Sequence, residues 1–274
     1  MHVKVSKASA SIALGAFRMT VRIDICGQVA VVTLDRPEKK HAITTEMRIQ
    51  LYESFEAIAE DNSVRAVLLT GSGGDFCSGM DVGEFGSRTM TDRSVRTLRL
   101  QRISRAIYRL KKPTIAAVRG VCMGAGWSYA LCCDFVIAAE DARFAQVFNR
   151  TALAPDAGAA WLLAQQIGIM KAKELCYSGR TINGITAAEL GLALKAVPAG
   201  EVHDEAMALA QELAGGPTMA IAMAKRQFEV AATTSFDTFL EAEFAMPPLM
   251  QLTEDHEEGV AAFRERRRPQ FRGT

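Results

Sequence analysis

Short apolar runs alternate with longer amphipathic segments over the first half of the chain. The runs are rich in β-branched residues and have the length of strands, at Val21–Ile25, Val29–Leu34, Val64–Thr70, Thr114–Val118 and Phe135–Ala139. Between them the apolar residues recur with the period of a helix, which predicts helices from Thr44 or Thr45 to about Glu60, over Asp92–Lys111 and over Trp127–Cys133. This alternation indicates βαβ units with right-handed crossovers.

The second half of the chain has an almost entirely helical pattern. The expected helices lie at Ala159–Ile167, Lys171–Tyr177, Thr186–Leu190, Val202–Leu213, Met219–Ala232, Phe236–Met250 and Glu254–Arg267. We therefore predict an α/β fold in three parts: an N-terminal extension (1–18), a core of βαβ units (19–212) and a helical C-terminal region (213–274). The basic, Ser/Ala-rich start of the chain is interpreted as a flexible extension, with a transit peptide as the alternative.

Composition excludes several classes of function. Lys and Arg number 32 against 31 Asp and Glu, so no global charge recruits nucleic acid or a membrane surface. No apolar stretch reaches the ~18 residues that a membrane span needs. The six cysteines form no CxxC pair and have no histidines near them, which disfavours a metal site and favours a reducing, cytoplasmic compartment.

Two glycine-rich loops follow predicted strands and precede helices. They are the segment Asp75–Asp81 (DFCSGMD) and the segment Gly120–Gly126 (GVCMGAG). A glycine turn at a helix start leaves backbone N–H groups unpaired, and these favour an oxygen that carries negative charge. Two such groups converging on one carbonyl would form an oxyanion hole, worth roughly 3 kcal/mol per donor to an enolate.

Several segments resemble the crotonase, or enoyl-CoA hydratase/isomerase, superfamily. They are LDRPEKKHA from Leu34, FCSGMD from Phe76, KPTIAAVRG from Lys112, the pair Cys133-Asp134 and EGVAAF from Glu258. The match covers about Met19 to Arg272, in order and with family-like spacing. The resemblance implies a spiral of βαβ turns with a helical C-terminal trimerisation region, a homotrimer or dimer of trimers, and an acyl-CoA thioester as substrate, without a further cofactor.

The resemblance also implies roles for loop residues. The backbone N–H groups of Met80 and Ala125 correspond to the oxyanion donors, provided that Ala125 has a backbone conformation open to alanine. The neighbouring Gly79, Asp81 and Gly124 are expected at the substrate site. Both glutamates of the hydratases are missing, because Ser128 and Phe148 stand at their positions. Water addition normally needs two carboxylates, so ordinary hydratase activity is disfavoured.

Asp156 is the carboxylate that the resemblance places beside these loops. Its segment, LAPDAGAAWLL from Leu153, is most similar to ring-1,2-epoxyphenylacetyl-CoA isomerases of phenylacetate degradation. One carboxylate can take a proton from one carbon and return it to another, and burial beside Phe148 and Trp161 would raise its pKa. The alternative is that Asp156 only caps the following helix.

Other candidate residues have weaker support. Ser128, Trp127 and Phe148 are expected at the substrate site, or else serve as packing residues. Lys39, Lys40 and His41, in a turn expected at the surface, match the family's nucleotide-side turn. Phe263 and Arg266 match C-terminal positions that reach the CoA of a neighbouring subunit, where cations suit a phosphate.

Three functions remain open on the sequence. The leading one is an acyl-CoA isomerase that shifts a double bond or opens a ring epoxide. The second is residual hydratase or lyase chemistry with another base, such as Asp75, Asp81, Glu84 or Asp92. The third is a CoA-binding protein without catalysis. The related 4-chlorobenzoyl-CoA dehalogenases also carry an aspartate at the position of Asp156, as a nucleophile, together with a histidine between the two glycine loops. This chain has no histidine there, which disfavours a dehalogenase.

Overall fold

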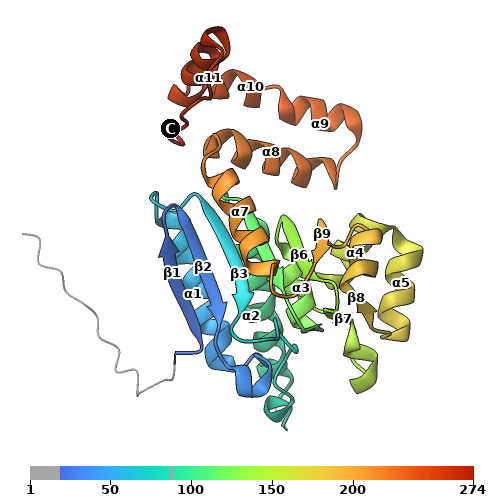
Figure 1. Ribbon diagram of the computed structural model, residues 1–274. Helices are drawn as coiled ribbons and strands as arrows, with labels where there is room; N and C mark the ends of the chain where they lie inside the picture. Colours follow the sequence, from blue (N-terminus) through green and yellow to red (C-terminus); the bar gives the residue numbers. More distant parts are fainter. Residues whose placement is uncertain (1–18, 87–88) are drawn as a thin grey trace, which may run out of the picture.

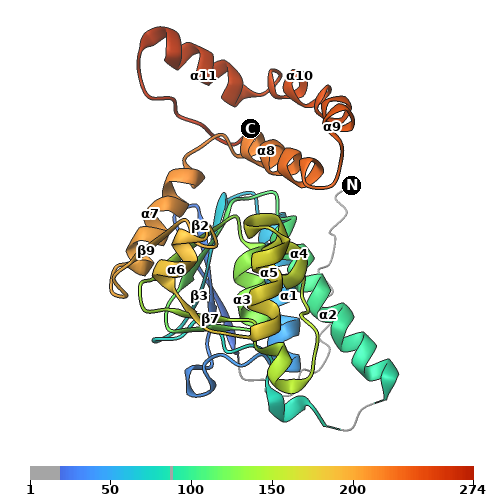
Figure 2. The same ribbon diagram turned by 90° about the vertical axis from the view of Figure 1, so that its right-hand side faces the viewer.

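The computed structural model describes residues 19–86 and 89–274 (Figure 1). This part of the chain forms an α/β body and a helical arm (α8–α11) that stands off from it in both views (Figures 1 and 2). The predicted extension, residues 1–18, lies outside the described residues. The predicted end of the core, residue 212, falls near the end of helix α7 (Val202–Ala214).

The larger sheet has six strands within the described residues. Their order is β1 (Val21–Cys26), β2 (Val29–Leu34), β3 (Ala66–Gly71), β4 (Thr114–Val118), β6 (Phe135–Ala139) and β9 (Lys195–Val197). β1 pairs antiparallel with β2 and the other pairs are parallel. β2, β3 and β4 are buried along their whole length, as expected for a parallel sheet covered on both faces. The five predicted strands are confirmed to within two residues.

Helices cover both faces of this sheet. Figures 1 and 2 show α7 on one face and α1 (Thr45–Glu60), α2 (Met90–Tyr108) and α3 (Ala125–Cys132) on the other. The starts of the first two are encoded locally. The hydroxyl of Thr44 accepts a hydrogen bond from the N–H of Met47, and Thr89 forms a capping box with Asp92.

A second, three-stranded sheet carries the second glycine loop. It consists of β5 (Val121–Met123), β7 (Arg143–Ala145) and β8 (Ile182–Asn183). These strands have two or three residues each, too few for an apolar alternation to be visible in the sequence. The chain thus passes from the larger sheet to the smaller one and back, which gives the predicted spiral.

The remaining helices are α4 (Ala159–Ile167), α5 (Ile169–Ser178), α6 (Gly184–Glu189), α8 (Thr218–Ala231), α9 (Phe236–Glu243), α10 (Met246–Met250) and α11 (Glu254–Glu265). Short 3-10 helices lie at η1 (Pro37–Lys39), η2 (Val82–Glu84) and η3 (Val147–Thr151). The single helix predicted over Phe236–Met250 is wrong. It is divided into α9 and α10, because Pro247 and Pro248 have no N–H group to continue a helix.

Candidate active site

The two glycine-rich loops lie in contact. Cys77 and Cys122 form an isolated β-bridge, and the N–H of Met123 donates to the carbonyl of Cys77 over 2.9 Å. Gly126 packs so closely on the first loop that a Cβ there would lie 2.6 Å from both Cβ and the carbonyl oxygen of Cys77. The sequence therefore needs glycine at 126 to bring the loops together.

This contact brings the two expected donors close together. A Cβ on Gly79, the residue before Met80, would lie 3.0 Å from the carbonyl oxygen of Met123 and 3.6 Å from the nitrogen of Ala125. Ala125 is the first residue of α3, where N–H groups have no partner within the helix. Across residues 19–86 and 89–274, neither Met80 nor Ala125 donates its N–H to another backbone group.

The backbone conformation of Ala125 is one that alanine can adopt, as its expected role as a donor requires. The positive φ angles in the second loop belong to Gly120 and Gly124 (both 52°), and Ala125 is not among the described non-glycine residues with positive φ. Alanine at this position therefore keeps its N–H available without backbone strain. The methyl side chain of Ala125 is therefore compatible with a free backbone N–H at the same residue.

A pocket of about 370 Å³ opens at the two loops. Six of the expected site residues line it: Gly79, Met80, Gly124, Ala125, Phe148 and Asp156. The rest of the wall comes from the end of the first loop, the segment before α2, α2 itself and η3 with the following chain, and includes Ser78, Val82, Phe85, Arg96, Thr97, Leu100, Val147, Thr151, Leu153, Ala154 and Pro155. The wall is mostly apolar and carries a few polar groups, as ligand pockets usually do.

Asp156 lies in the wall with one buried oxygen unpaired. Its Oδ1 has no hydrogen-bond partner within the described part of the chain. Burial raises the pKa of this carboxyl to about 6, although the cation of Arg96 acts in the opposite direction. The predicted rise in pKa is thus present. Trp161, predicted beside it, is 41% exposed, packs edge-to-face on Tyr108 and is not part of the pocket wall.

The structure excludes helix capping as the role of Asp156. Helix α4 begins at Ala159, with Gly158 as its N-cap and no side-chain cap hydrogen bond. Ala157 (φ 52°) and Gly158 (φ 88°) both take the left-handed backbone conformation, which separates Asp156 from the helix start. The carboxyl is therefore held in the pocket wall by the loop and not by a helix terminus.

Trp127 and Ser128 do not line the pocket. All residues of α3 are buried, and the Trp127 ring packs against Phe144 with 5.5 Å between ring centroids. The Ser128 hydroxyl lies 3.1 Å from the carbonyl oxygen of Gly124 and 3.2 Å from that of Asp156. The expectation that they contact substrate is corrected: they are packing residues, and Ser128 joins the second loop to the Asp156 segment.

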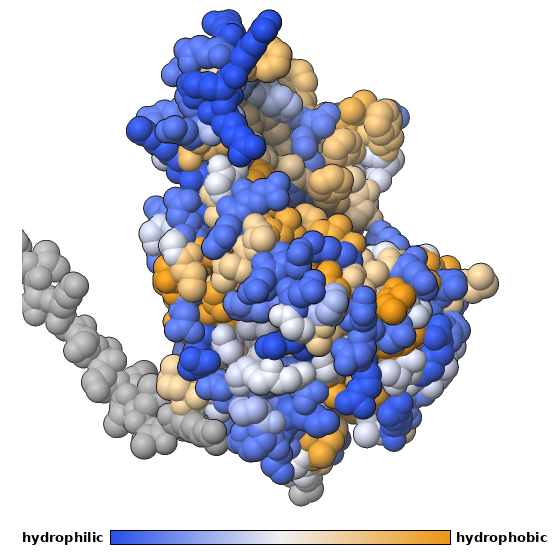
Figure 3. Space-filling view, in the orientation of Figure 1, coloured by the Kyte–Doolittle hydropathy of each residue, from blue (hydrophilic) through white to orange (hydrophobic). Residues whose placement is uncertain are grey.

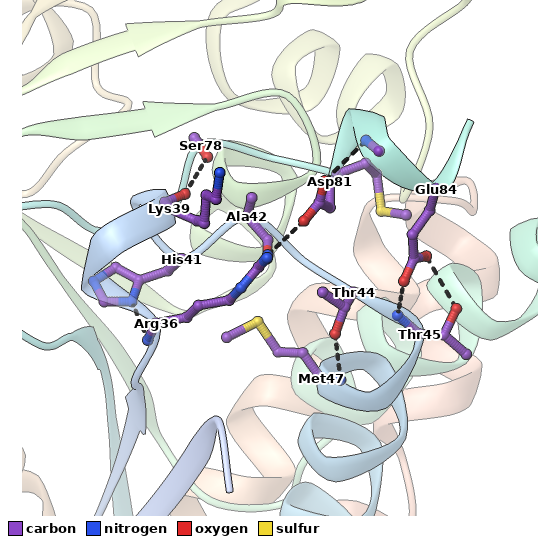
Figure 4. Close-up of polar contacts among 12 residues, drawn as sticks. Arg36, Lys39, His41, Ala42, Thr44, Thr45, Met47, Ser78, Asp81 and Glu84 are labelled. Carbon is purple, nitrogen blue, oxygen red and sulfur yellow. Dashed lines mark hydrogen bonds and ion pairs between the residues drawn. The ribbon is translucent and has the colours of Figure 1, made fainter. Parts of the chain in front are cut away.

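Asp81 is likewise a structural residue of the first loop. Its carboxylate accepts a hydrogen bond of 2.5 Å from Arg36 and another of 2.9 Å from the N–H of Gly83 (Figure 4). The hydrogen bond from Arg36 holds the pKa of Asp81 below its usual range. Asp81 is not part of the pocket wall, and its expected place at the substrate site stays a prediction.

A second ion pair lies on the other side of Met80. Arg48 donates to Glu84 over 3.0 Å, and Glu84 also accepts hydrogen bonds from the N–H and the hydroxyl of Thr45 (Figure 4). The other terminal nitrogen of Arg48 lies 3.7 Å from Sδ of Met80. Burial acts to raise the pKa of Glu84, but its hydrogen bonds to Thr45 and the charge of Arg48 leave it lowered overall. No sequence motif predicts the ion pair between Arg48 and Glu84.

His41 is buried, contrary to its predicted place in a surface turn. Its Nδ1 accepts a hydrogen bond of 2.9 Å from the N–H of Arg36, and its Nε2 lies 2.8 Å from the carbonyl oxygen of Ser72. Burial lowers its pKa. Lys39 and Lys40 are exposed, and their carbonyl groups accept hydrogen bonds from Ser78, which lines the pocket. The basic turn therefore lies at the rim of the pocket.

Phe263 and Arg266 lie far from this pocket in the same chain. Both belong to the end of α11, at the opposite end of the molecule from the start of α2 (Figures 1 and 2). Phe263 is 86% exposed. Any contact of these residues with a CoA at the pocket would have to come from another copy of the chain.

Neither a metal-binding cluster nor a membrane-spanning helix is found in the described part of the chain. These residues contain no group of three or more His, Cys, Asp or Glu side chains placed to hold a metal ion. None of the helices within 19–86 and 89–274 is long and apolar enough to cross a membrane.

Comparison of the sequence and the fold with known proteins identifies the family. The sequence model of the enoyl-CoA hydratase/isomerase family matches residues 24–274. A "Probable enoyl-CoA hydratase" of Rhodobacter capsulatus is 37% identical over 93% of this chain and 98% of its own length. The 1,2-epoxyphenylacetyl-CoA isomerase of Escherichia coli is 35% identical over 89% of this chain and 95% of its own. The crystal structure of an enoyl-CoA hydratase from Bacillus anthracis superposes with a TM-score of 0.89 at 29% identity, covering 93% of this chain and all of that one.

The fold, the paired loops and these matches place the protein in one class. The chain belongs to the enoyl-CoA hydratase/isomerase family of the crotonase superfamily.

Proposed function

We propose that this protein is an acyl-CoA isomerase that works through a thioester enolate with Asp156 as its single acid and base. The reaction is the shift of a carbon–carbon double bond or the isomerisation of a ring epoxide on the acyl group. The observation that carries the proposal is the buried, unpaired Oδ1 of Asp156 in the wall of the pocket that the two glycine loops open.

The proposed steps use groups that line this pocket. The thioester carbonyl accepts hydrogen bonds from the N–H groups of Met80 and Ala125. The ionised Asp156 takes a proton from the acyl chain, and the negative charge moves onto the carbonyl oxygen as an enolate. The same carboxyl then returns the proton to another carbon of the conjugated system. Its pKa of about 6 suits both steps near neutral pH, because neither form is strongly disfavoured.

Hydration remains the second candidate, because most of the related proteins carry the name hydratase. It requires a second group to activate water. The carboxylates considered for this role do not line the pocket: the side chain of Asp75 accepts the N–H of Val121, and Asp81 and Glu84 are held in ion pairs. Asp92 is held in the capping box of α2. These contacts favour isomerisation over water addition.

The test is proton NMR of the purified protein with a 3-enoyl-CoA and with a 2-enoyl-CoA in deuterated buffer. Migration of the double bond with deuterium uptake at the α- and γ-carbons, abolished in Asp156→Asn, is the expected result. A 3-hydroxyacyl product carrying oxygen from labelled water would establish a hydratase instead. Saturable binding of acyl-CoA with no exchange in either sample would indicate a CoA-binding protein without catalysis.

We further propose a homotrimer, or a dimer of trimers, assembled through the helical arm. The arm exposes large apolar side chains, among them Phe228 (78%), Phe244 (83%), Leu252 (83%) and Phe263 (86%). Figure 3 shows apolar surface where the arm meets the body. An apolar cavity of about 430 Å³ lies there, between α3, α4 and α8. Exposed apolar surface of this extent is usual for an interface. Sedimentation velocity of the purified chain tests the assembly.

A further inference from the structure

The direction of the Met80 N–H is set by the peptide unit that it shares with the carbonyl of Gly79. In a planar trans peptide these two groups point in opposite directions. The carbonyl of Gly79 accepts a hydrogen bond of 2.8 Å from the N–H of Ile43, and the N–H of Asp81 donates to the carbonyl of Ile43 over 3.1 Å. Ile43 therefore holds the chain on both sides of Met80 and aims the Met80 N–H away from itself.

Ile43 ends a turn, residues 36–43, that lies along the first loop (Figure 4). The carbonyl of Lys40 accepts a hydrogen bond of 2.9 Å from the N–H of Ser78, so a shift of the turn moves the loop with it. Lys40 (φ 48°) and His41 (φ 54°) both take the left-handed backbone conformation. Two such residues in succession are unusual without glycine, so contacts around the turn have to hold this conformation.

The imidazole of His41 supplies two of these contacts. Its Nδ1 accepts a hydrogen bond of 2.9 Å from the N–H of Arg36, at the start of the turn (Figure 4). Its Nε2 lies 2.8 Å from the carbonyl oxygen of Ser72, which directly follows β3. A backbone N–H only donates and a carbonyl only accepts, so the ring is neutral with its proton on Nε2. The ring thus ties the turn to the end of β3.

We propose that His41 is a positioning residue of the oxyanion hole, which holds the turn so that the Met80 N–H points at the thioester carbonyl. Its side chain is not part of the pocket wall, and it acts through Ile43 and Gly79. The proposal deepens the proposed function and rests on its assignment of Met80 as an oxyanion donor. It does not depend on whether the bound thioester is isomerised or hydrated.

The experiment measures the infrared band of the thioester carbonyl in hexanoyl-CoA bound to the purified chain. Hydrogen bonds to a carbonyl weaken its C=O bond and lower the frequency of this band. A sample with ¹³C at the carbonyl carbon, subtracted from an unlabelled one, separates the band from those of the protein. The saturated acyl group has no double bond to shift, so the readout does not require turnover. Calorimetry verifies that the site is saturated in each sample.

Three variants change the contacts of the ring. His41→Ala removes both hydrogen bonds. His41→Gln has a longer amide that suits the Ser72 carbonyl and leaves the N–H of Arg36 without its acceptor. His41→Asn places an oxygen near the position of Nδ1, where it can accept from Arg36, and asparagine tolerates the left-handed conformation.

The matched control is Thr114→Val. It removes a buried hydroxyl that donates to Asp134 over 2.8 Å, at the end of β4 opposite the second loop. Circular dichroism and thermal unfolding verify that each variant is folded at the temperature of measurement and give its loss of stability.

The expected result is a band at lower frequency than that of the free thioester in the wild type, Thr114→Val and His41→Asn. In His41→Ala and His41→Gln we expect about half of that shift or more to be lost, because one of two donors is no longer aimed at the carbonyl. If His41→Ala does not fold, the comparison of His41→Gln with His41→Asn carries the test.

A wild-type band in folded His41→Ala or His41→Gln overturns the proposal. Equal loss in His41→Gln and His41→Asn also overturns it, as does a loss in Thr114→Val as large as that in His41→Gln. A wild-type band no lower than that of the free thioester would remove the oxyanion donors themselves, and with them the proposed function. Failure of that assignment is thus distinguishable from failure of the role of His41.

Discussion

The guanidinium of Arg48 lies between Glu84 and Met80. One terminal nitrogen donates to the carboxylate of Glu84 over 3.0 Å, and the other lies 3.7 Å from Sδ of Met80. The Arg48 side chain is only 1% exposed. Met80, whose N–H is the proposed oxyanion donor, thus lies in contact with an ion pair that joins α1 to η2, directly after the first loop.

Removal of Glu84 should therefore destabilise the protein strongly. Glu84→Ala leaves the buried charge of Arg48 without its partner, and we expect the free energy of unfolding to fall by about 3 kcal/mol. The control is Glu174→Ala, which removes the partner of Arg180 in a pair more than 40% exposed on both sides and should cost less than about 1 kcal/mol. Urea denaturation measures both. Similar losses of unfolding free energy in the two variants would show that burial does not make the Arg48–Glu84 pair more stabilising than an exposed pair.

A methyl group on Gly79 should block the pocket at its donors. In Gly79→Ala the added Cβ would lie 3.0 Å from the carbonyl oxygen of Met123 and 3.6 Å from the nitrogen of Ala125, at a φ of 95° that alanine rarely adopts. We expect kcat/KM to fall about a hundredfold or more, the loss typical of one oxyanion donor.

The matched control for Gly79→Ala is Gly74→Ala, directly before the same loop. A Cβ at Gly74 would have no heavy atom within 4 Å, so activity should stay within about twofold of the wild type. Equal kinetics of the two alanine variants would contradict the assignment of the Met80 and Ala125 amides as oxyanion donors.

The pH dependence of turnover should follow Asp156. The base form is the ionised carboxylate, so kcat/KM should rise with pH through the pKa of about 6 and then level off. Since the charge of Arg96 favours the ionised form, Arg96→Gln should move the inflection to higher pH. Initial rates of double-bond migration across the acid and neutral range measure this. An inflection that does not move in Arg96→Gln would show that the two groups are not electrostatically coupled.

The stability of the protein should also depend on pH through Asp156. Its pKa in the folded state, about 6, lies above the ordinary value of 3.8, so the folded state binds this proton more tightly than the unfolded state. The resulting stability is fully present below pH 3.8 and is lost as the pH rises through about 6.

Asp156→Asn should remove that dependence. At neutral pH the wild type has to hold an ionised, poorly solvated carboxylate, so the variant should be more stable by at most about 3 kcal/mol. At pH 4 the difference should nearly vanish. Denaturant titrations at the two pH values measure it. A variant less stable than the wild type at neutral pH would mean that the ionised carboxylate makes favourable contacts in the folded protein.

Much of this architecture could be read from local sequence. The central strands are buried apolar runs between helices with hydroxyl N-caps, and both features are visible in a single chain. Asp156 and the two loops, which line one pocket, could be singled out because they stand in motifs. The strands of the small sheet could not be predicted, because they have two or three residues each and a period of two is undetectable over so short a stretch.

The corrected residues share a physical reason. His41 looked like a surface side chain because its partners, the N–H of Arg36 and the carbonyl of Ser72, are main-chain groups with no sequence signature. Trp127 and Ser128 lie next to a donor in sequence, but α3 is buried on all sides and they lie behind the pocket wall. Arg96 and Phe85 line the same pocket as the two loops only because the chain folds them together, which a one-dimensional pattern does not contain.

The tight contact of Gly126 with Cys77 has an evolutionary consequence. It fixes two main-chain amides, which no side-chain replacement can delete, whereas the groups at 128, 148 and 156 are ordinary side chains on separate segments. Under the proposed mechanism, a lineage that keeps this glycine can exchange one carboxylate for another by single-codon changes and still hold the thioester carbonyl at the two amides. New reactions can then arise on a scaffold that keeps its substrate-binding loops.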